Sequence, residues 1–137
     1  MDALEGLWRL VSSRAWDEQG SELPPPYGSL PFGEMMFSGG RMLAALCNGD
    51  AQLPAGQGRG FSSYGGFYSF DGQTLITRVD MSSDAQRIGS EQRRGVVLLD
   101  ENTAVLHPPA RRYGSGTVQR RELLWQRVWR PDAGEKP

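Results

Sequence analysis

Short runs of alternating apolar and polar residues, separated by turn signals, fill most of this chain. These runs favour β-strands over helices, because no segment of ten or more residues has an apolar period of 3.6. Asp71-Gly72 and Gly39-Gly40 predict tight hairpin turns, and residues 100–102 predict a third hairpin loop. The pattern predicts strands near residues 7–13, 33–38, 42–47, 64–70, 74–81, 91–99, 104–107 and 122–129.

The connections between these strands bear on how the sheet is arranged. Eight or so strands in a chain of this length predict an all-β fold, either a closed barrel or a sandwich. Most connections are hairpins and none demands a Greek-key crossing, which favours closure. We therefore predict a single antiparallel up-and-down β-barrel of about eight to ten strands over residues 1–130. The polar residues 131–137 are expected to form a flexible C-terminal tail.

Two connections are longer than a hairpin loop. Residues 17–32 are rich in proline and residues 48–63 are rich in glycine and polar side chains. Long loops without secondary structure of their own are often functional lids. We predict that residues 48–63 form a lid over one mouth of the barrel. The "GQGRG" stretch within them fits neither phosphate-binding loop pattern, so it does not indicate a nucleotide site.

Composition and charge narrow the function classes. The 137 residues suffice for one domain, and the net charge of −1 argues against a general nucleic-acid binder. No apolar run approaches the length of a membrane span, and the first residues do not look like a secretory signal. A cytoplasmic protein is the default expectation. The lone Cys47 and lone His107 argue against a disulfide and against an all-protein zinc site, and we expect no cofactor.

Several stretches in the same order along the chain carry a family resemblance. They are "GLWRLVS", "PFGEMMFSGGRMLAAL", "YGGFYSFDG", "IGSEQRR" and "LLWQRV". Together they resemble the bacterial and fungal lipocalin-like domain family. The resemblance implies a small-molecule-binding barrel in which Arg127 packs across Trp8 near Gly6 and seals the floor. Some members lie beside natural-product pathways, where related barrels act as cyclases or isomerases.

The match to the family is not complete. The family's middle strand usually carries one or two histidines before a valine and an acid, and residues 77–80 read Thr-Arg-Val-Asp here. The role of that histidine therefore does not carry over. Gly89, Gln92 and Arg94 do match the family's "Gly-x-x-Gln-x-Arg" pattern. His107 stands where the family has a threonine near a Pro-Pro pair.

Four polar residues on two neighbouring strands form the first candidate site. Arg78 and Asp80 share one face of a strand, and Gln92 and Arg94 share one face of the next. If both faces point inward, the ions neutralise one another and leave one cation to orient a carboxylate or enolate oxygen. The alternative is that they form ordinary cross-strand ion pairs outside the barrel.

Aromatic residues and methionines form the second candidate. Tyr64, Tyr68, Phe70, Met35 and Phe37 are expected to share faces of adjacent strands. Such a set can line a ligand cup with tyrosine hydroxyls as its placed polar groups. A filled core is the alternative, since an eight-stranded barrel is just wide enough for side chains alone.

Two further features admit a plain interpretation beside a functional one. His107, the only histidine, can serve as a general base or be simply a residue of the barrel rim. The arginines around "YGSGTVQ" are interpreted as the solvated tip of a basic hairpin. They are Arg111, Arg112, Arg120 and Arg121.

The hypothesis from sequence is that the barrel binds a small, largely apolar organic molecule with a carbonyl or anionic end. The protein then either isomerises, cyclises or eliminates that molecule without metal or nucleotide, or only binds it. An oligomeric accessory role, such as a homodimer, also stays open because both faces of the last strand look coverable. The predicted catalytic residues are Arg78, Asp80, Arg94, Tyr68 and His107. The predicted ligand-binding residues are Met35, Phe37, Tyr64, Gln92 and Trp125.

Overall fold

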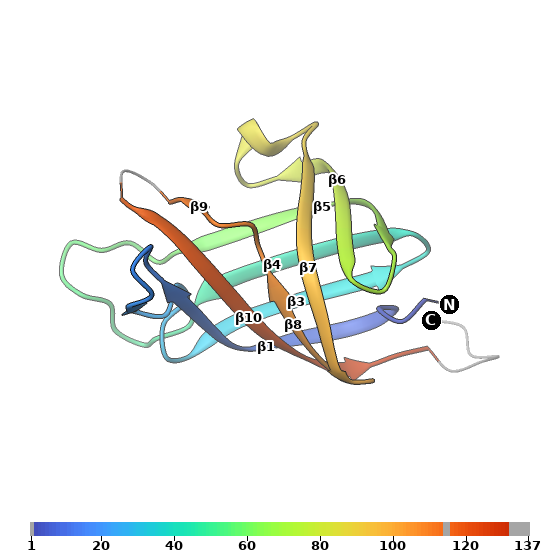
Figure 1. Cartoon of the computed structure of the whole chain (residues 1–137), viewed down its shortest axis with the longest axis horizontal. Helices are drawn as coiled ribbons and strands as arrows, with labels where there is room; N and C mark the ends of the chain where they lie inside the picture. Colours follow the sequence, from blue (N-terminus) through green and yellow to red (C-terminus); the bar gives the residue numbers. More distant parts are fainter. Residues whose placement is uncertain (1, 114–115, 132–137) are drawn as a thin grey trace.

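Eight long antiparallel strands close into a barrel in the computed structural model, which describes residues 2–113 and 116–131 (Figure 1). One two-residue strand pairs with the first long strand and another with the last, and a single turn of 3₁₀-helix lies between β6 and β7. The barrel strands are β1 (Gly6–Trp16), β3 (Pro31–Ser38), β4 (Arg41–Asn48), β5 (Phe61–Phe70), β6 (Thr74–Ser82), β7 (Glu91–Asp100), β8 (Thr103–His107) and β10 (Val118–Trp129). The short elements are β2 (Glu22–Leu23), η1 (Ala85–Arg87) and β9 (Arg111–Arg112).

The strand order confirms the predicted up-and-down barrel. From β3 to β8 every strand pairs with the next one in sequence, and β8 pairs with β10. The first and last barrel strands then pair with each other, with Trp8 opposite Arg127 in the register. This pairing leaves the barrel without a free edge, which removes a row of unpaired backbone groups. All eight predicted strands are present, although β1 and β10 are longer than predicted.

The two ends of the barrel differ in how the strands are joined. Tight turns at residues 39–40, 71–73 and 101–102 join the strands at one end, which we call the floor. Gly39 and Gly40 both have positive φ, as the favoured two-residue hairpin turn requires. The long connections after β1, β4, β6 and β8 lie at the opposite end, which we call the mouth (Figure 1).

Residues before β1 cover the floor, and Arg127 fastens them. Its guanidinium donates hydrogen bonds to the carbonyl oxygens of Glu5 at 2.6 Å and Ala3 at 2.8 Å, and to that of Glu101. The same group lies over the Trp8 ring, 4.6 Å from its centroid, which confirms the predicted contact. Gly6 has a φ of 121°, and a Cβ there would lie 2.2 Å from a β10 carbonyl oxygen. Only glycine therefore fits where the first strand meets the last.

The half of the barrel nearer the floor is a packed core. Inward-facing side chains alternate with outward-facing ones along each strand, as the pleat requires. The largest side chains that are almost completely buried are Trp8, Trp125, Phe37, Leu4, Met35, Met42 and Leu75. The predicted tail falls mostly on residues 132–137, which lie outside the described part of the chain.

Candidate functional site

A small hollow opens at the mouth of the barrel above the packed core. Its volume is about 60 Å³, which has room for a few water molecules or one small polar group. Apolar residues form its base, among them Leu106, Leu123 and Trp125. Arginines and tyrosines form its walls: Arg87, Arg94, Arg111, Arg121, Tyr27, Tyr64 and Tyr113.

Five different elements bring these walls together. Arg94 shares the inward face of β7 with Gln92 and Val96, because residues two apart on a strand point the same way. Arg121 likewise shares the inward face of β10 with Leu123. The other wall residues come from β5, β9, η1 and the connections beside them. The hollow is therefore built from segments far apart in the sequence.

The arginines of the hollow have no carboxylate partner within residues 2–113 and 116–131. No ion pair in the described part of the chain includes Arg87, Arg94, Arg111 or Arg121. Arg94 donates only to the neighbouring Arg93 carbonyl oxygen, at 2.9 Å. Arg121 donates to the side-chain oxygen of a glutamine at 3.3 Å, and Arg87 to a serine hydroxyl at 3.4 Å. The lining residues include no aspartate and no glutamate.

Burial and like charge both act against the guanidinium cations. Burial lowers the pKa of Arg94, and the charges of Arg87 and Arg111 lower it further, against an opposing effect of two tyrosines. Burial also lowers the pKa of Arg121, and Arg111 adds to that effect. Arginine stays protonated in proteins despite such shifts. The hollow therefore holds several cations whose charge no carboxylate of the described residues neutralises.

Aromatic rings hold three of these guanidinium groups in place. Arg121 lies over the Tyr113 ring at 3.4 Å from its centroid, and Arg111 lies over the same ring at 4.4 Å. Arg87 lies over the Tyr64 ring at 4.7 Å. Stacking against a ring face leaves the N–H groups at the guanidinium edge free to bind acceptors.

Hydrogen-bond donors without acceptors lie in and below the hollow. The indole Nε1 of Trp125, at the base, has no hydrogen-bond partner among the described residues. The side-chain Nε2 of Gln92, one inward position from Arg94 on β7, is also buried without one. A buried donor without an acceptor costs about 1–3 kcal/mol. The site thus offers an excess of donors as well as of positive charge.

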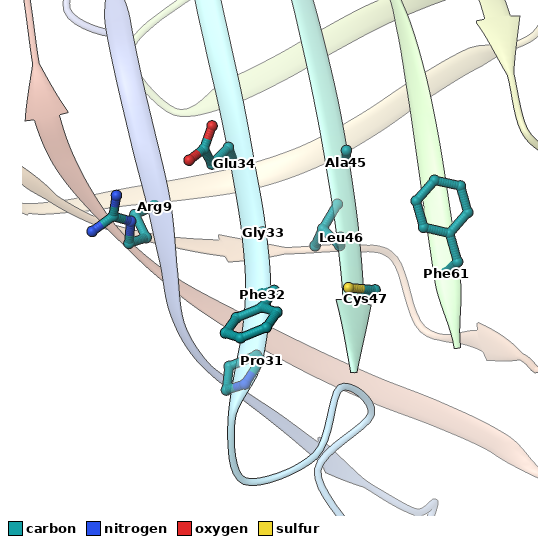
Figure 2. A pocket seen from close by; sticks show the side chains of 9 residues that line it. All are labelled: Arg9, Pro31, Phe32, Gly33, Glu34, Ala45, Leu46, Cys47 and Phe61. Carbon is teal, nitrogen blue, oxygen red and sulfur yellow. The ribbon is translucent and has the colours of Figure 1, made fainter. Parts of the chain in front are cut away.

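A larger hollow of about 600 Å³ lies on the outer face of β3, β4 and β5 (Figure 2). Phe32 and Phe61 form its apolar walls, but they are 64% and 62% exposed, so this groove is open to solvent. Arg9 and Glu34 carry opposite charges within it (Figure 2). This outer groove encloses a bound molecule less than the barrel mouth does, and the charges of Arg9 and Glu34 balance each other. We therefore take the mouth as the candidate site.

Comparison with known proteins gives the family. A sequence profile of the lipocalin-like domain family matches residues 5–128, a stretch that includes both the floor and the arginines of the mouth. The chain belongs to the lipocalin-like domain family. No curated protein matches the chain. Among solved structures, a redesigned β-barrel is similar to this lipocalin-like domain, with a TM-score of 0.46 and 12% identity over 93% of each chain. No helix in residues 2–113 and 116–131 is long and apolar enough to span a membrane.

The structure of this lipocalin-like domain divides the predicted polar cluster. Gln92 and Arg94 face inward, but Arg78 and Asp80 point outward from β6, so the hypothesis of one inward cluster is wrong for these two. Arg78 pairs with Glu91 at 3.5 Å. Asp80 accepts two hydrogen bonds of 2.8 Å from the guanidinium of Arg41, which lower its pKa. Both are the cross-strand ion pairs of the alternative interpretation.

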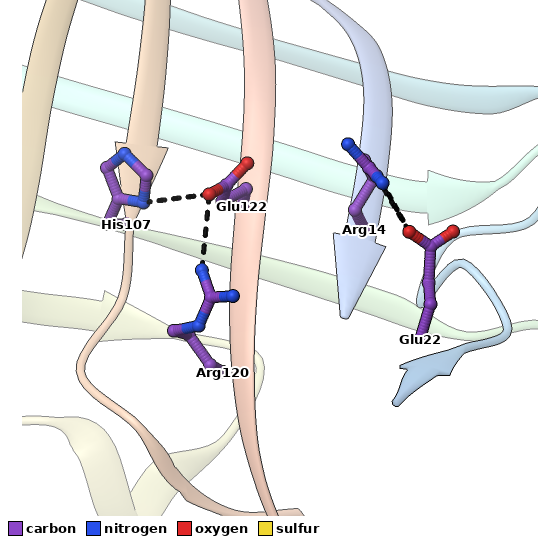
Figure 3. A network of polar contacts seen from close by, with 5 residues as sticks. All are labelled: Arg14, Glu22, His107, Arg120 and Glu122. Atoms are coloured by element: carbon purple, nitrogen blue, oxygen red, sulfur yellow. Dashed lines mark hydrogen bonds and ion pairs between the residues drawn. The ribbon is translucent and has the colours of Figure 1, made fainter. Parts of the chain in front are cut away.

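His107 and Tyr68 also lie away from the hollow. His107 is on the outer face of β8, with its Nδ1 3.7 Å from a Glu122 oxygen that also pairs with Arg120 (Figure 3). Tyr68 lies at the floor, where its hydroxyl donates to Asp2 at 2.5 Å, and burial raises its pKa. Neither residue lines the hollow, so the structure does not bring them together with Arg94, as one catalytic site with the predicted residues would require.

The predicted ligand cup is only partly present. Met35 and Phe37 pack in the core, and the Phe37 ring meets the Tyr68 ring edge-on at 4.9 Å. Neither residue lines the mouth hollow, whereas Tyr64 and Trp125 do. The half of the barrel nearer the floor is therefore a filled core and not a ligand cup.

Most of the residues that form the walls of the hollow were not predicted from the sequence as site residues. Arg111 and Arg121 were interpreted as parts of a solvated hairpin tip, yet both line the hollow. Arg121 lies two and four residues before Leu123 and Trp125, so the strand alternation places it on their face. That signal was available in the sequence. For Arg87, Tyr27 and Tyr113, which lie outside the barrel strands, no such pattern exists.

The connection predicted to be a lid supplies no wall of the hollow in residues 49–60. It extends from the mouth end of the barrel (Figure 1). Arg59 fastens it by donating to the carbonyl oxygens of Asn48 at 2.5 Å and Asp50 at 2.9 Å. Asp50 in turn accepts from the Leu30 amide at 2.8 Å. The opening motion of a lid stays a prediction.

Proposed function

We propose that this lipocalin-like domain binds a small organic anion at the mouth of its barrel. The observation that supports this most directly is the gathering of four arginines around one hollow whose lining contains no carboxylate. Arg87, Arg94 and Arg121 are half-buried and Arg111 is exposed, and none of the four has a carboxylate partner among the described residues. Such charges favour a ligand of opposite charge. Membership of a lipocalin-like family fits small-molecule binding.

The size of the hollow limits which part of the ligand enters it. Ligand pockets usually measure about 300–1,000 Å³, and this one measures about 60 Å³. It therefore suits the charged end of a molecule rather than the whole of it. The rest of the ligand would extend outward past the half-buried rings of Tyr27 and Tyr113. This differs from an apolar molecule enclosed deep in the barrel, because the core there is filled.

Binding without turnover is the function that the lining favours. Isomerisation or elimination needs a group that accepts a proton. Besides its arginines, the lining has only three tyrosines as titratable groups. Burial raises the pKa of Tyr27, which keeps its phenol protonated and makes it a donor rather than a base. The arginines could stabilise a developing oxyanion, but nothing in the lining supplies the proton transfer.

Trp125 at the base of the hollow provides the assay. Fluorescence titration and calorimetry with benzoate, phenyl sulfate and phenyl phosphate are expected to give saturable binding that weakens with salt. Arg94→Met removes a wall cation and is expected to weaken binding at least about tenfold. Arg93→Met is the matched control, since Arg93 is the next residue on β7 but points outward.

Equal losses in the two variants would contradict the proposal, because they would indicate a general effect of surface charge. Unchanged affinity in Arg94→Met would contradict it as well. Circular dichroism and urea unfolding of both variants show whether the barrel remains folded.

A further inference from the structure

The charges around the mouth indicate how many negative charges the ligand carries, as well as that it is an anion. The four arginines that line the hollow carry four formal positive charges, and two of them, Arg87 and Arg111, repel the charge of Arg94. A single negative charge would leave most of this excess in place. A doubly charged ligand would neutralise twice as much of it within the same half-buried space.

The hollow also requires both charges to lie close together. At about 60 Å³ it has room for one compact polar group but not for two carboxylates on an extended chain. A phosphate group attached through one oxygen carries nearly two charges above its second pKa of about 6. It presents three acceptor oxygens, whereas a carboxylate presents two.

The donors around the hollow match such a group. Guanidinium forks bind phosphate oxygens through pairs of N–H bonds, and the Tyr113 ring holds the guanidinium groups of both Arg111 and Arg121. Arg121 uses its Nε–H for a glutamine oxygen, which leaves its two terminal nitrogens for a ligand. The unpartnered indole N–H of Trp125 lies at the base, where an inserted oxygen would end. The half-buried Tyr27 lines the hollow as well and offers its ring to the organic part of the ligand.

We infer that the ligand of this site is an organic phosphate monoester whose doubly charged phosphate enters the arginine-lined mouth. The inference rests on the proposed function, because it specifies the anion that the same site binds. It excludes a simple carboxylate as the preferred ligand. The organic part lies toward the tyrosines, so the ester binds more tightly than inorganic phosphate.

Phenyl phosphate and phenyl sulfate test the charge directly, because they have nearly the same shape and differ by about one charge. At about pH 7.5 we expect phenyl phosphate to bind about tenfold or more tightly than phenyl sulfate. As the pH falls through about 6, phenyl phosphate gains a proton and its advantage is expected to shrink. Phenyl sulfate keeps its charge and is expected to bind equally at both values of pH.

A second pair of measurements tests the residues and the source of the phosphate. Arg111→Met is expected to reduce the preference for phenyl phosphate over phenyl sulfate, while Arg112→Met, on the same short strand but outside the lining, keeps it. Inorganic phosphate that binds as tightly as phenyl phosphate would overturn the assignment to an ester.

The two proposals fail in different ways. Equal affinity for phenyl phosphate and phenyl sulfate, or a preference that does not change with pH, would overturn the doubly charged ligand but leave the anion site standing. Binding of none of the four probes, benzoate and inorganic phosphate included, would overturn the anion site as well.

Discussion

Arg127→Met is expected to open the floor of the barrel without changing the strand pattern. Arg127 joins three separate parts of the chain, because it donates to carbonyl oxygens of Ala3, Glu5 and Glu101 and lies over the Trp8 ring. Methionine keeps much of the side-chain length and loses all of the donors. The residues before β1 would then lose their main polar attachment to the last strand.

The magnitude follows from counting these contacts. Each lost hydrogen bond is worth about 1 kcal/mol net, and the cation–π contact adds about 0.5–1 kcal/mol. Half-buried Arg127 also pays for desolvation, which lowers its pKa, and methionine recovers that cost. We expect a net loss of about 2–3 kcal/mol in the free energy of unfolding. With a urea m-value of about 1–3 kcal/mol/M, the unfolding midpoint falls by about 0.7–3 M.

Urea unfolding followed by tryptophan fluorescence measures this loss, and Trp8 reports on the floor itself. The matched control is Arg130→Met. Arg130 lies near the end of the same strand, but it makes a single exposed ion pair with Glu101 at 3.5 Å, so less than about 0.5 kcal/mol is expected there. If the two variants lost the same stability, the argument for Arg127 as the fastening of the floor would be refuted.

Two further predictions concern β6. The hydrogen bonds from Arg41 lower the pKa of Asp80 in the folded state. Ionised Asp80 therefore stabilises the fold above its unfolded pKa of about 4. That contribution is lost as the pH falls through the lower pKa of the folded state. The stability difference between the parent protein and Asp80→Asn, from urea midpoints at several pH values, should therefore vanish in acid; a difference that persisted there would contradict it. Gly66→Ala places a Cβ 1.8 Å from a carbonyl oxygen of β6 and should cost about 2 kcal/mol or more, whereas Gly95→Ala, 3.7 Å from its nearest neighbour, should stay within about 0.5 kcal/mol in the same assay. Equal costs at the two glycines would contradict this reasoning.

The fold could be predicted from the sequence because its signals are local. Hairpin turns such as Gly39-Gly40 and Asp71-Gly72 join neighbouring strands, and alternation marks the strands themselves. The barrel's closure is not local, since it depends on pairing between β1 and β10. The contact between Trp8 and Arg127 was predicted from family resemblance, not from the pattern of the strands.

The site was harder to predict because alternation defines two faces of a strand without saying which one is inside. On β6, Leu75, Thr77 and Val79 are buried, so Arg78 and Asp80 must point outward. Ile76 lies on the outward face as well, which made the two faces look similar in the sequence. On β7 the face of Gln92 and Arg94 is the inward one, and the buried Val96 continues it.

The pairing of the first strand with the last also decides where extra material can be attached. β1 begins and β10 ends at the floor, where Leu7 and Trp129 are opposite each other in the register (Figure 1). A tag, surface anchor or second protein joined just before β1 or just after β10 would therefore leave from the side away from the arginines. The mouth would stay open to solvent in an immobilised protein, and a short linker between the two ends would allow a circular permutant that opens at a mouth connection.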